Sequence, residues 1–174
     1  MSVRPILLLG NPGLRVICAR VKQFDTPDLR SLVADLRDTL HDFRSRHGFG
    51  RGIAAPQIGE EHRVIVIEVE EPVTLVNPVI TRRSRTMMTL WDDCFSFPDL
   101  AVKLKRNVAI EVRYQDIAGK RATMKVKGGT AELLQHEIDH LNGVLAIDRS
   151  MGSRYIVYKT EIKKLDDSGR RRGM

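Results

Sequence analysis

The segment Gln135-His136-Glu137-Ile138-Asp139-His140 constrains this chain more than any other part of its sequence. Residues four apart on an α-helix lie on one face, so His136 and His140 can offer two imidazoles to one metal ion. Glu137 lies one step round the helix, close to the same ion without being needed as a ligand. Two histidines at this spacing, with a glutamate after the first, are typical of metal-dependent hydrolases, so we predict a metal-binding helix here.

The composition is that of an ordinary globular protein. We expect residues 1–174 to form a single domain, which is long enough to bury a core. Cys18 and Cys94 are too few for a disulfide framework, and we find neither a secretory leader nor an apolar run that could span a bilayer. These features predict a cytoplasmic protein with no membrane or DNA partner. The formal net charge of +7 favours attraction to polyanions.

A long helix is predicted near the N-terminus, after an irregular segment at residues 3–24. Thr26 followed by Pro27 is typical of a helix start. Apolar residues then recur at helical spacing from Leu29 to Phe43. The pattern indicates an amphipathic helix at about residues 27–46 that ends near Gly48.

The middle of the chain has the alternation of strands. We expect strands at residues 63–69, two strands within 73–90 joined by a turn at Asn77-Pro78, strands within 101–114, and a return strand at 121–127 after a turn at 116–119. Thr130 is the expected cap of the metal-binding helix and Gly143 its end. The predicted fold class is therefore α+β, with antiparallel β-sheets packed around the central metal-binding helix.

A hydrolytic metal site needs a third protein ligand and an open position. Glu161 is the only glutamate downstream of the helix, and nothing around it resembles a ligand motif. Upstream, Cys94 lies in a loop that Pro98 bounds, and we interpret it as a ligand rather than as a buried structural cysteine. One thiolate and two imidazoles suit Fe(II), Zn(II), Co(II) or Ni(II).

Three motifs in this order make the sequence resemble the peptide deformylases over about residues 4–150. A glycine–alanine loop that ends in glutamine corresponds to residues 50–57, a cysteine-containing segment to residues 92–96, and Gln-His-Glu-x-Asp-His to residues 135–140. The glycine loop is interpreted as a tightly packed site loop rather than a flexible one.

The resemblance implies removal of the formyl group from the N-terminal formyl-methionine of newly made proteins, so the expected partners are N-formylated nascent peptides. It implies one divalent metal ion, most often Fe(II) in the cell and often replaced by zinc, with Ni(II) and Co(II) as further options. The metal ligands that it implies are Cys94, His136 and His140.

The resemblance also assigns catalytic and binding roles. Glu137 is the implied general acid and base, and the Gln57 side chain and the Phe95 backbone N–H are the implied donors to the developing oxyanion. Gln135 and Asp139 are expected to support the ligands. The substrate-binding residues are expected to be Gly52, Arg51 and Leu133.

The sequence departs from the family pattern at two places. Asp92-Asp93 stands where the family usually has Glu-Gly, and Arg51 stands where it usually has an apolar residue that lines the pocket for the methionine side chain. We hypothesise that Arg51 and Asp93 pair across the cleft, with Asp92 as the alternative partner. These charges leave open a related metal-dependent amidase or deacylase with altered substrate preference, and also a weakly catalytic, ribosome-binding protein.

The chain ends in the basic segment Ser-Gly-Arg-Arg-Arg-Gly-Met, residues 168–174. Residues 170–174 have the composition of a frayed, solvated tail. A contact between this tail and the phosphates of ribosomal RNA is the alternative.

Overall fold

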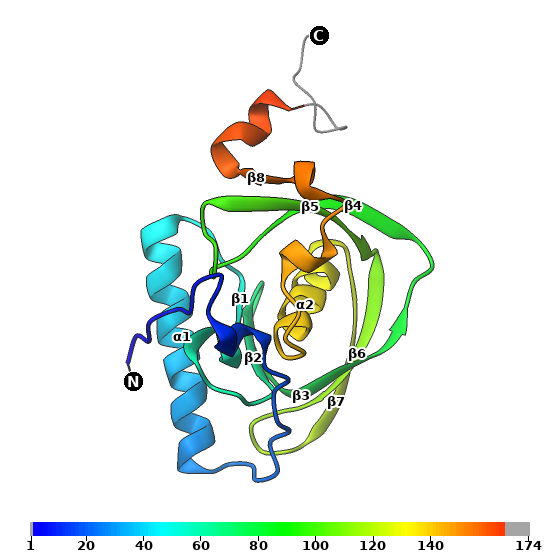
Figure 1. Ribbon diagram of the computed structural model, residues 1–174. Coiled ribbons are helices and arrows are strands. Elements are labelled where there is room, and N and C mark those ends of the chain that lie inside the picture. Colours follow the sequence, from blue (N-terminus) through cyan, green and yellow to red (C-terminus); the bar gives the residue numbers. More distant parts are fainter. Residues whose placement is uncertain (1, 166–174) are drawn as a thin grey trace.

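Two antiparallel sheets enclose helix α2 (Gly128–His140), and helix α1 (Pro27–His47) packs on the outside, as Figure 1 shows for the computed structural model. The structure describes residues 2–165. One sheet has the strand order β1-β2-β3-β6-β7 and the other β4-β5-β8, with antiparallel pairing throughout. The α+β class is confirmed. Within residues 2–165, no helix has the length and apolar character needed to cross a membrane.

The strands and short helices have the following bounds. The five-stranded sheet contains β1 (Gly52–Ala54), β2 (Val64–Glu68), β3 (Pro72–Arg83), β6 (Ala109–Gln115) and β7 (Arg121–Lys127). The three-stranded sheet contains β4 (Met87–Asp93), β5 (Leu100–Asn107) and β8 (Ile156–Tyr158). Short 3-10 helices lie at Pro12–Arg15, Ala55–Ile58, Ala146–Arg149, Ser153–Tyr155 and Lys159–Lys164.

Strand β2 explains how the layers stack. Its alternate residues Val64 and Val66 pack in the core shared with α1, while Ile65 and Ile67 pack in the core shared with α2. A strand covered on both faces has an almost continuous apolar sequence, which is the pattern here. The five-stranded sheet therefore separates the two helices, and α2 lies between this sheet and the three-stranded one (Figure 1).

Helix α1 begins and ends at capping residues. The Thr26 hydroxyl accepts a hydrogen bond from the backbone N–H of Leu29, and Gly48 adopts a left-handed conformation with φ of 75°. Leu36 and Leu40 on its inner face are fully buried. Burial of such side chains stabilises the fold by about 1.5–3 kcal/mol each.

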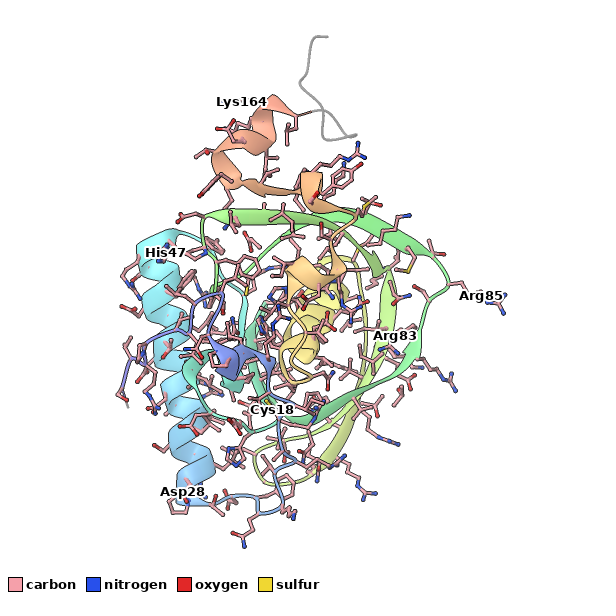
Figure 2. All side chains as sticks on the ribbon, viewed as in Figure 1. Cys18, Asp28, His47, Arg83, Arg85 and Lys164 are labelled. Carbon is pink, nitrogen blue, oxygen red and sulfur yellow. The ribbon has the colours of Figure 1, made fainter. Side chains whose placement is uncertain are left out.

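The predicted turn at Asn77-Pro78 is wrong, because β3 runs straight through these residues. Asn77 has a φ of 52° and produces a register shift between Val76 and Val79, so the local signal marks a bulge rather than a reversal. The Asn77 side chain secures the bulge through two hydrogen bonds to the Val21 backbone. The chain reverses later, between the end of β3 at Arg83 and the start of β4 at Met87, where Figure 2 shows Arg85 at the outer edge of the molecule.

Of the two predictions for the ends of α2, the one for the start is wrong and the one for the end is confirmed. The helix starts before the predicted cap Thr130, with Lys127 as the cap residue and no side-chain capping bond. Gly143 has the predicted left-handed conformation, with φ of 70°. A Cβ at this position would lie 2.5 Å from the Arg15 carbonyl oxygen, so only glycine fits without a shift of backbone.

Two loop predictions are also confirmed. Residues 116–119 form the hairpin turn between β6 and β7, where the Asp116 carboxylate accepts backbone hydrogen bonds from Ala118 and Lys120. The segment before α1 is irregular apart from one short helix and isolated bridges. It hydrogen-bonds to both site loops, from Leu7 to the Gln57 carbonyl and from Leu9 to the Ser96 carbonyl, at 2.8 Å each.

Candidate metal centre

The structure brings Cys94, His136 and His140 together in the interior. Their ligand atoms all lie within 4.8 Å of one another. His140 Nε2 lies 3.2 Å from both His136 Nε2 and Cys94 Sγ. The histidines come from the C-terminal half of α2, and the cysteine follows β4. Three buried sulfur and nitrogen donors that converge in this way match the donor set of a transition-metal site.

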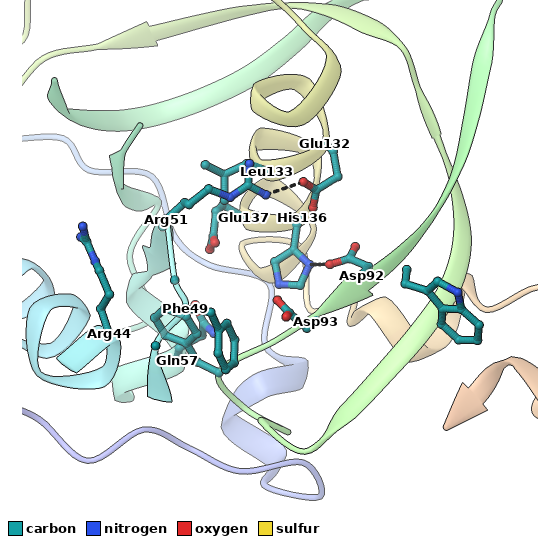
Figure 3. A pocket seen from close by; sticks show the side chains of 15 residues that line it. Arg44, Phe49, Arg51, Gln57, Asp92, Asp93, Glu132, Leu133, His136 and Glu137 are labelled. Atoms are coloured by element: carbon teal, nitrogen blue, oxygen red, sulfur yellow. Dashed lines mark hydrogen bonds and ion pairs between the residues drawn. The ribbon is translucent and has the colours of Figure 1, made fainter. Parts of the chain in front are cut away.

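His136 is oriented by a carboxylate behind it. Its Nδ1 lies 2.9 Å from Asp92 Oδ1, which leaves Nε2 directed at the other two donors (Figure 3). Burial alone would raise the pKa of Asp92, but His136 and the Arg106 guanidinium hold it well below its usual range. Arg106 donates to Asp92 Oδ2 from Nη2 at 2.8 Å and to Asp139 Oδ2 from Nη1 at 2.6 Å. Asp92, Arg106 and Asp139 therefore form a buried ion chain that ends on His136.

Gln135 and Asp139, which were expected to support the ligands, make no direct hydrogen bond to Cys94, His136 or His140 within residues 2–165. Asp139 contacts Arg106, which in turn contacts Asp92, so Asp139 reaches His136 only through these two residues. It also accepts hydrogen bonds from Arg149. Gln135 exchanges hydrogen bonds with the backbone of Asn107 at 3.0 Å, which fixes α2 to β5. Both side chains hold the helix in place.

Glu137 is buried beside the centre. Burial raises its pKa to about 7, which is the range in which a carboxyl group can both take and release a proton at neutral pH. A Cβ at Gly52 would lie 3.0 Å from Glu137 Oε1 and 3.1 Å from Leu133 Cδ1. Gly52 therefore leaves room for the carboxylate and for the side chain of Leu133.

Gln57 and Phe95 both adjoin Cys94. Gln57 Oε1 accepts a hydrogen bond from the Ala54 N–H at 2.9 Å, so its Nε2 is the group that faces Cys94, 3.7 Å from Sγ. The Phe95 ring stacks on Phe43 of α1 with centroids 3.8 Å apart. This packing anchors the residue that follows Cys94.

A cavity of about 470 Å³ adjoins the centre, and Figure 3 shows the side chains that line it. Arg51 lies on its wall, as predicted, but its partner is not Asp93. Arg51 Nη2 lies 2.6 Å from Glu132 Oε2, while Asp93 pairs with Lys159 at 2.9 Å. Asp92, the alternative partner, is held by His136 and Arg106. The hypothesis of an Arg51–Asp93 pair is wrong, because the two aspartates have nearer cations.

Glu132 and Arg106 were not among the predicted residues, although the sequence contains a signal for each. Glu132 lies four residues before His136, so helical periodicity puts both on one face. Arg106 lies two residues after Leu104, so strand periodicity puts it on the inner face of β5 with that buried leucine. In each case the periodicity gives the face, and only the tertiary structure gives the partner.

The fold and the site together define a metal-dependent hydrolase: a buried cysteine and two histidines, with a carboxyl group of near-neutral pKa beside an open cavity. Comparison with known proteins narrows this class. The family described as polypeptide deformylase matches residues 3–154. A peptide deformylase from Brucella suis is 40% identical over 172 residues, which covers 95% of this chain and 94% of the relative.

Solved structures agree with the sequence comparison. A peptide deformylase from Legionella pneumophila superposes with a TM-score of 0.79 at 36% identity, covering 85% of this chain and 86% of the other. A Met-Ala-Ser-bound class I type b peptide deformylase from Acinetobacter baumannii gives 0.78 at 30% identity, covering 85% and 98%. The chain belongs to the peptide deformylase family. It is a hydrolase that removes the formyl group from the N-terminal formyl-methionine of newly made proteins.

Proposed function

We propose that Cys94, His136 and His140 hold one divalent metal ion and that deformylation takes place at this centre. The observation that carries the proposal is the convergence of three buried donor atoms within 4.8 Å beside Glu137. Burial lowers the pKa of His140 well below its usual range, which keeps its lone pair available to a metal. On this proposal α2 is the metal-binding helix of the fold.

The donor set restricts the metal. A thiolate with two imidazoles suits Fe(II), Zn(II), Ni(II) and Co(II), and we propose Fe(II) as the metal used in the cell. An Fe(II) centre next to a thiolate is oxidisable, so activity is expected to decline in air.

The residues around the centre divide the chemistry between them. When bound, the metal supplies a Lewis acid for the formyl carbonyl and a water that ionises near neutral pH. Glu137 takes the proton of the attacking water and passes a proton to the leaving amine, which yields formate and a free N-terminus. Gln57 Nε2 and the Phe95 N–H donate to the oxygen that becomes negative. Gly52, Arg51 and Leu133 contact the peptide in the adjoining cavity.

Metal content tests the ligand assignment directly. The protein purified without air should contain one metal ion per chain by mass spectrometry, and Cys94→Ala should lose most of it. Cys18→Ala is the matched control, because Cys18 is the second buried free cysteine and lies in the core outside the centre. Full metal content in Cys94→Ala, or none in the unaltered protein, would contradict the assignment.

Three broader features belong to the same proposal. We place the enzyme in the cytoplasm, where formylated nascent peptides emerge, and treat residues 1–174 as one catalytic domain. The basic tail at 170–174 lies outside the described residues. For it we propose a contact with ribosomal RNA, whose affinity must fall steeply with salt. Ribosome pelleting with and without residues 169–174, at two salt concentrations, tests this contact, and equal pelleting would exclude it.

A further inference from the structure

The cavity beside the metal centre has an ion pair built into one wall. Arg51 reaches from the loop before β1 to helix α2, where Nη2 lies 2.6 Å from Glu132 Oε2 (Figure 3). Its Nη1 donates a hydrogen bond to the Gly129 carbonyl at 3.2 Å. Glu132 precedes His136 by four residues, just over one helical turn, which is a rise of about 6 Å. The ion pair is therefore one turn away from the proposed reacting centre.

The surroundings hold this pair in one geometry. The Glu132 side chain is 12% exposed and that of Arg51 is 46% exposed. Burial raises the pKa of Glu132, and Arg51 opposes that rise. A Cβ at Gly129 would lie 3.2 Å from Arg51 Nη1, so the absence of a side chain there leaves space for the guanidinium. Two contacts to α2 thus position the half-exposed Arg51 side chain at the wall of the cavity.

Because the cavity adjoins Glu137, it is the space that the side chain of the formylated residue would occupy. The formyl group must lie next to Glu137, and the side chain of the formylated residue then extends into the adjoining space. Phe49, Trp91 and Leu133 line that space together with Arg51 and Glu132. The three apolar residues suit the stem of an unbranched side chain. The guanidinium has five N–H groups, and the contacts with Gly129 and Glu132 use two of them.

We propose that Arg51, positioned by Glu132, is a specificity-determining residue that selects formylated residues with a hydrogen-bond acceptor near the tip of the side chain. A hydrocarbon tip covers the guanidinium without offering a hydrogen-bond acceptor. An N–H group that loses water and gains no acceptor makes binding of such a substrate less favourable. Thioether sulfur is a weak acceptor and sulfoxide oxygen is a strong one. Compared with an enzyme that has an apolar residue at position 51, the gain in kcat/KM should be largest for methionine sulfoxide, smaller for methionine and smallest for norleucine. The inference rests on the proposed function, because it requires the formylated residue to occupy this cavity.

Substrates that differ only near the tip of an unbranched side chain test the selection. We compare kcat/KM for formyl-Xaa-Ala-Ser peptides, where Xaa is norleucine, methionine or methionine sulfoxide. The ratio of sulfoxide to norleucine should fall about tenfold or more in Arg51→Leu, since a hydrogen bond to a charged donor is lost. Glu132→Leu should lower the ratio by a smaller factor, because Arg51 remains but loses its anchor. Arg46→Leu is the control, since Arg46 pairs with Asp42 on α1.

The double variant Arg51→Leu/Glu132→Leu keeps the test valid if Arg51→Leu does not fold. It leaves no buried carboxylate without a partner, and replacement of both members of a pair is tolerated better than removal of one. Its ratio should equal that of Arg51→Leu, because the two residues act as one unit and their effects do not add.

Binding can be measured without turnover. Trp91 is the only tryptophan of the chain and lines the cavity, so its fluorescence should report occupancy by the deformylated peptides. Relative affinities for the sulfoxide and norleucine peptides should shift in the same direction as kcat/KM.

The outcomes separate the two proposals. If the metal-loaded enzyme cleaves none of the peptides, the proposed function fails. If it cleaves them with a sulfoxide-to-norleucine ratio that the folded single or double variant leaves unchanged, only the role of Arg51 is overturned. Selectivity that follows the second residue of the peptide instead of the first would overturn it as well.

Discussion

Helices α1 and α2 pack against opposite faces of the same sheet, yet they bury different chemistry. The inner face of α1 is aliphatic and aromatic apart from Asp35 and Thr39, and Arg44 and Arg46 near its C-terminus form ion pairs at the rim of the helix. In α2 every residue from Leu133 to His140 is buried, and five of them are polar or ionisable: Gln135, His136, Glu137, Asp139 and His140. Packing alone gives no reason for this polar burial, which costs free energy unless each group has a partner.

The difference shows what each helix contributes. Helix α1 stabilises the fold by removing apolar surface from water. Helix α2 instead buries the residues that we propose as metal donors and proton carrier, and the ion chain through Arg106 offsets part of the cost of their burial. Changes on α2 should therefore alter chemistry or cause large losses of stability, whereas changes at the rim of α1 should do neither.

The largest expected effect is on turnover, in Glu137→Ala. Loss of a positioned acid and base lowers kcat by about 10²- to 10⁴-fold. Metal content and the melting temperature should change little, because Glu137 adjoins the proposed ligands and is not one of them. Glu70→Ala, at an exposed position, is the control and should retain full activity. A kcat close to normal in Glu137→Ala would show that another group carries the proton.

The next largest effect is on stability, in Arg106→Met. This change removes the buried cation that Asp92 and Asp139 share, which leaves Asp92 with His136 and Asp139 with Arg149, and breaking a buried pair costs about 3–5 kcal/mol. Arg46→Met, which breaks the exposed pair with Asp42, should cost less than about 1 kcal/mol. Urea denaturation of the two variants measures both values. If both variants lost the same free energy of unfolding, the buried ion chain through Arg106 would stabilise the fold no more than the exposed ion pair of Arg46.

Local signals in the sequence predict the parts of the fold and site that depend on local geometry. The pairing of His136 with His140 follows from helical spacing, and the left-handed Gly143 follows from its place at the end of the helix. Asn77 carries a local turn signal too, but the signal does not distinguish a bulge from a reversal, since the pairing of β3 with β6 decides between them.

Partners across the fold depend on tertiary register and could not be predicted in this way. Arg51 and Asp93 are both charges beside the cleft, so their pairing looks natural in the sequence. In the structure, α2 carries Glu132 to Arg51, and Lys159 reaches Asp93. Choosing among several carboxylates requires distances of a few ångströms, and sequence spacing gives these only within one helix or one strand.

The smallest expected effect is that of Glu68→Gln, at the contact between α1 and β2. Burial alone would raise the pKa of Glu68, but hydrogen bonds from Arg44 and His41 hold it below the usual 4.5. Because the pKa is lower in the folded state, the stabilisation by this carboxylate is present above pH 4.5 and is lost as the pH falls through the folded value. The variant should therefore be less stable at pH 7 by under about 1 kcal/mol, and the difference should shrink on acidification. Denaturation curves at several pH values measure it, with kcat unchanged. A difference that grew in acid would mean that Glu68 is stabilised in its protonated form, and the rim of α1 would then resemble the interior of α2.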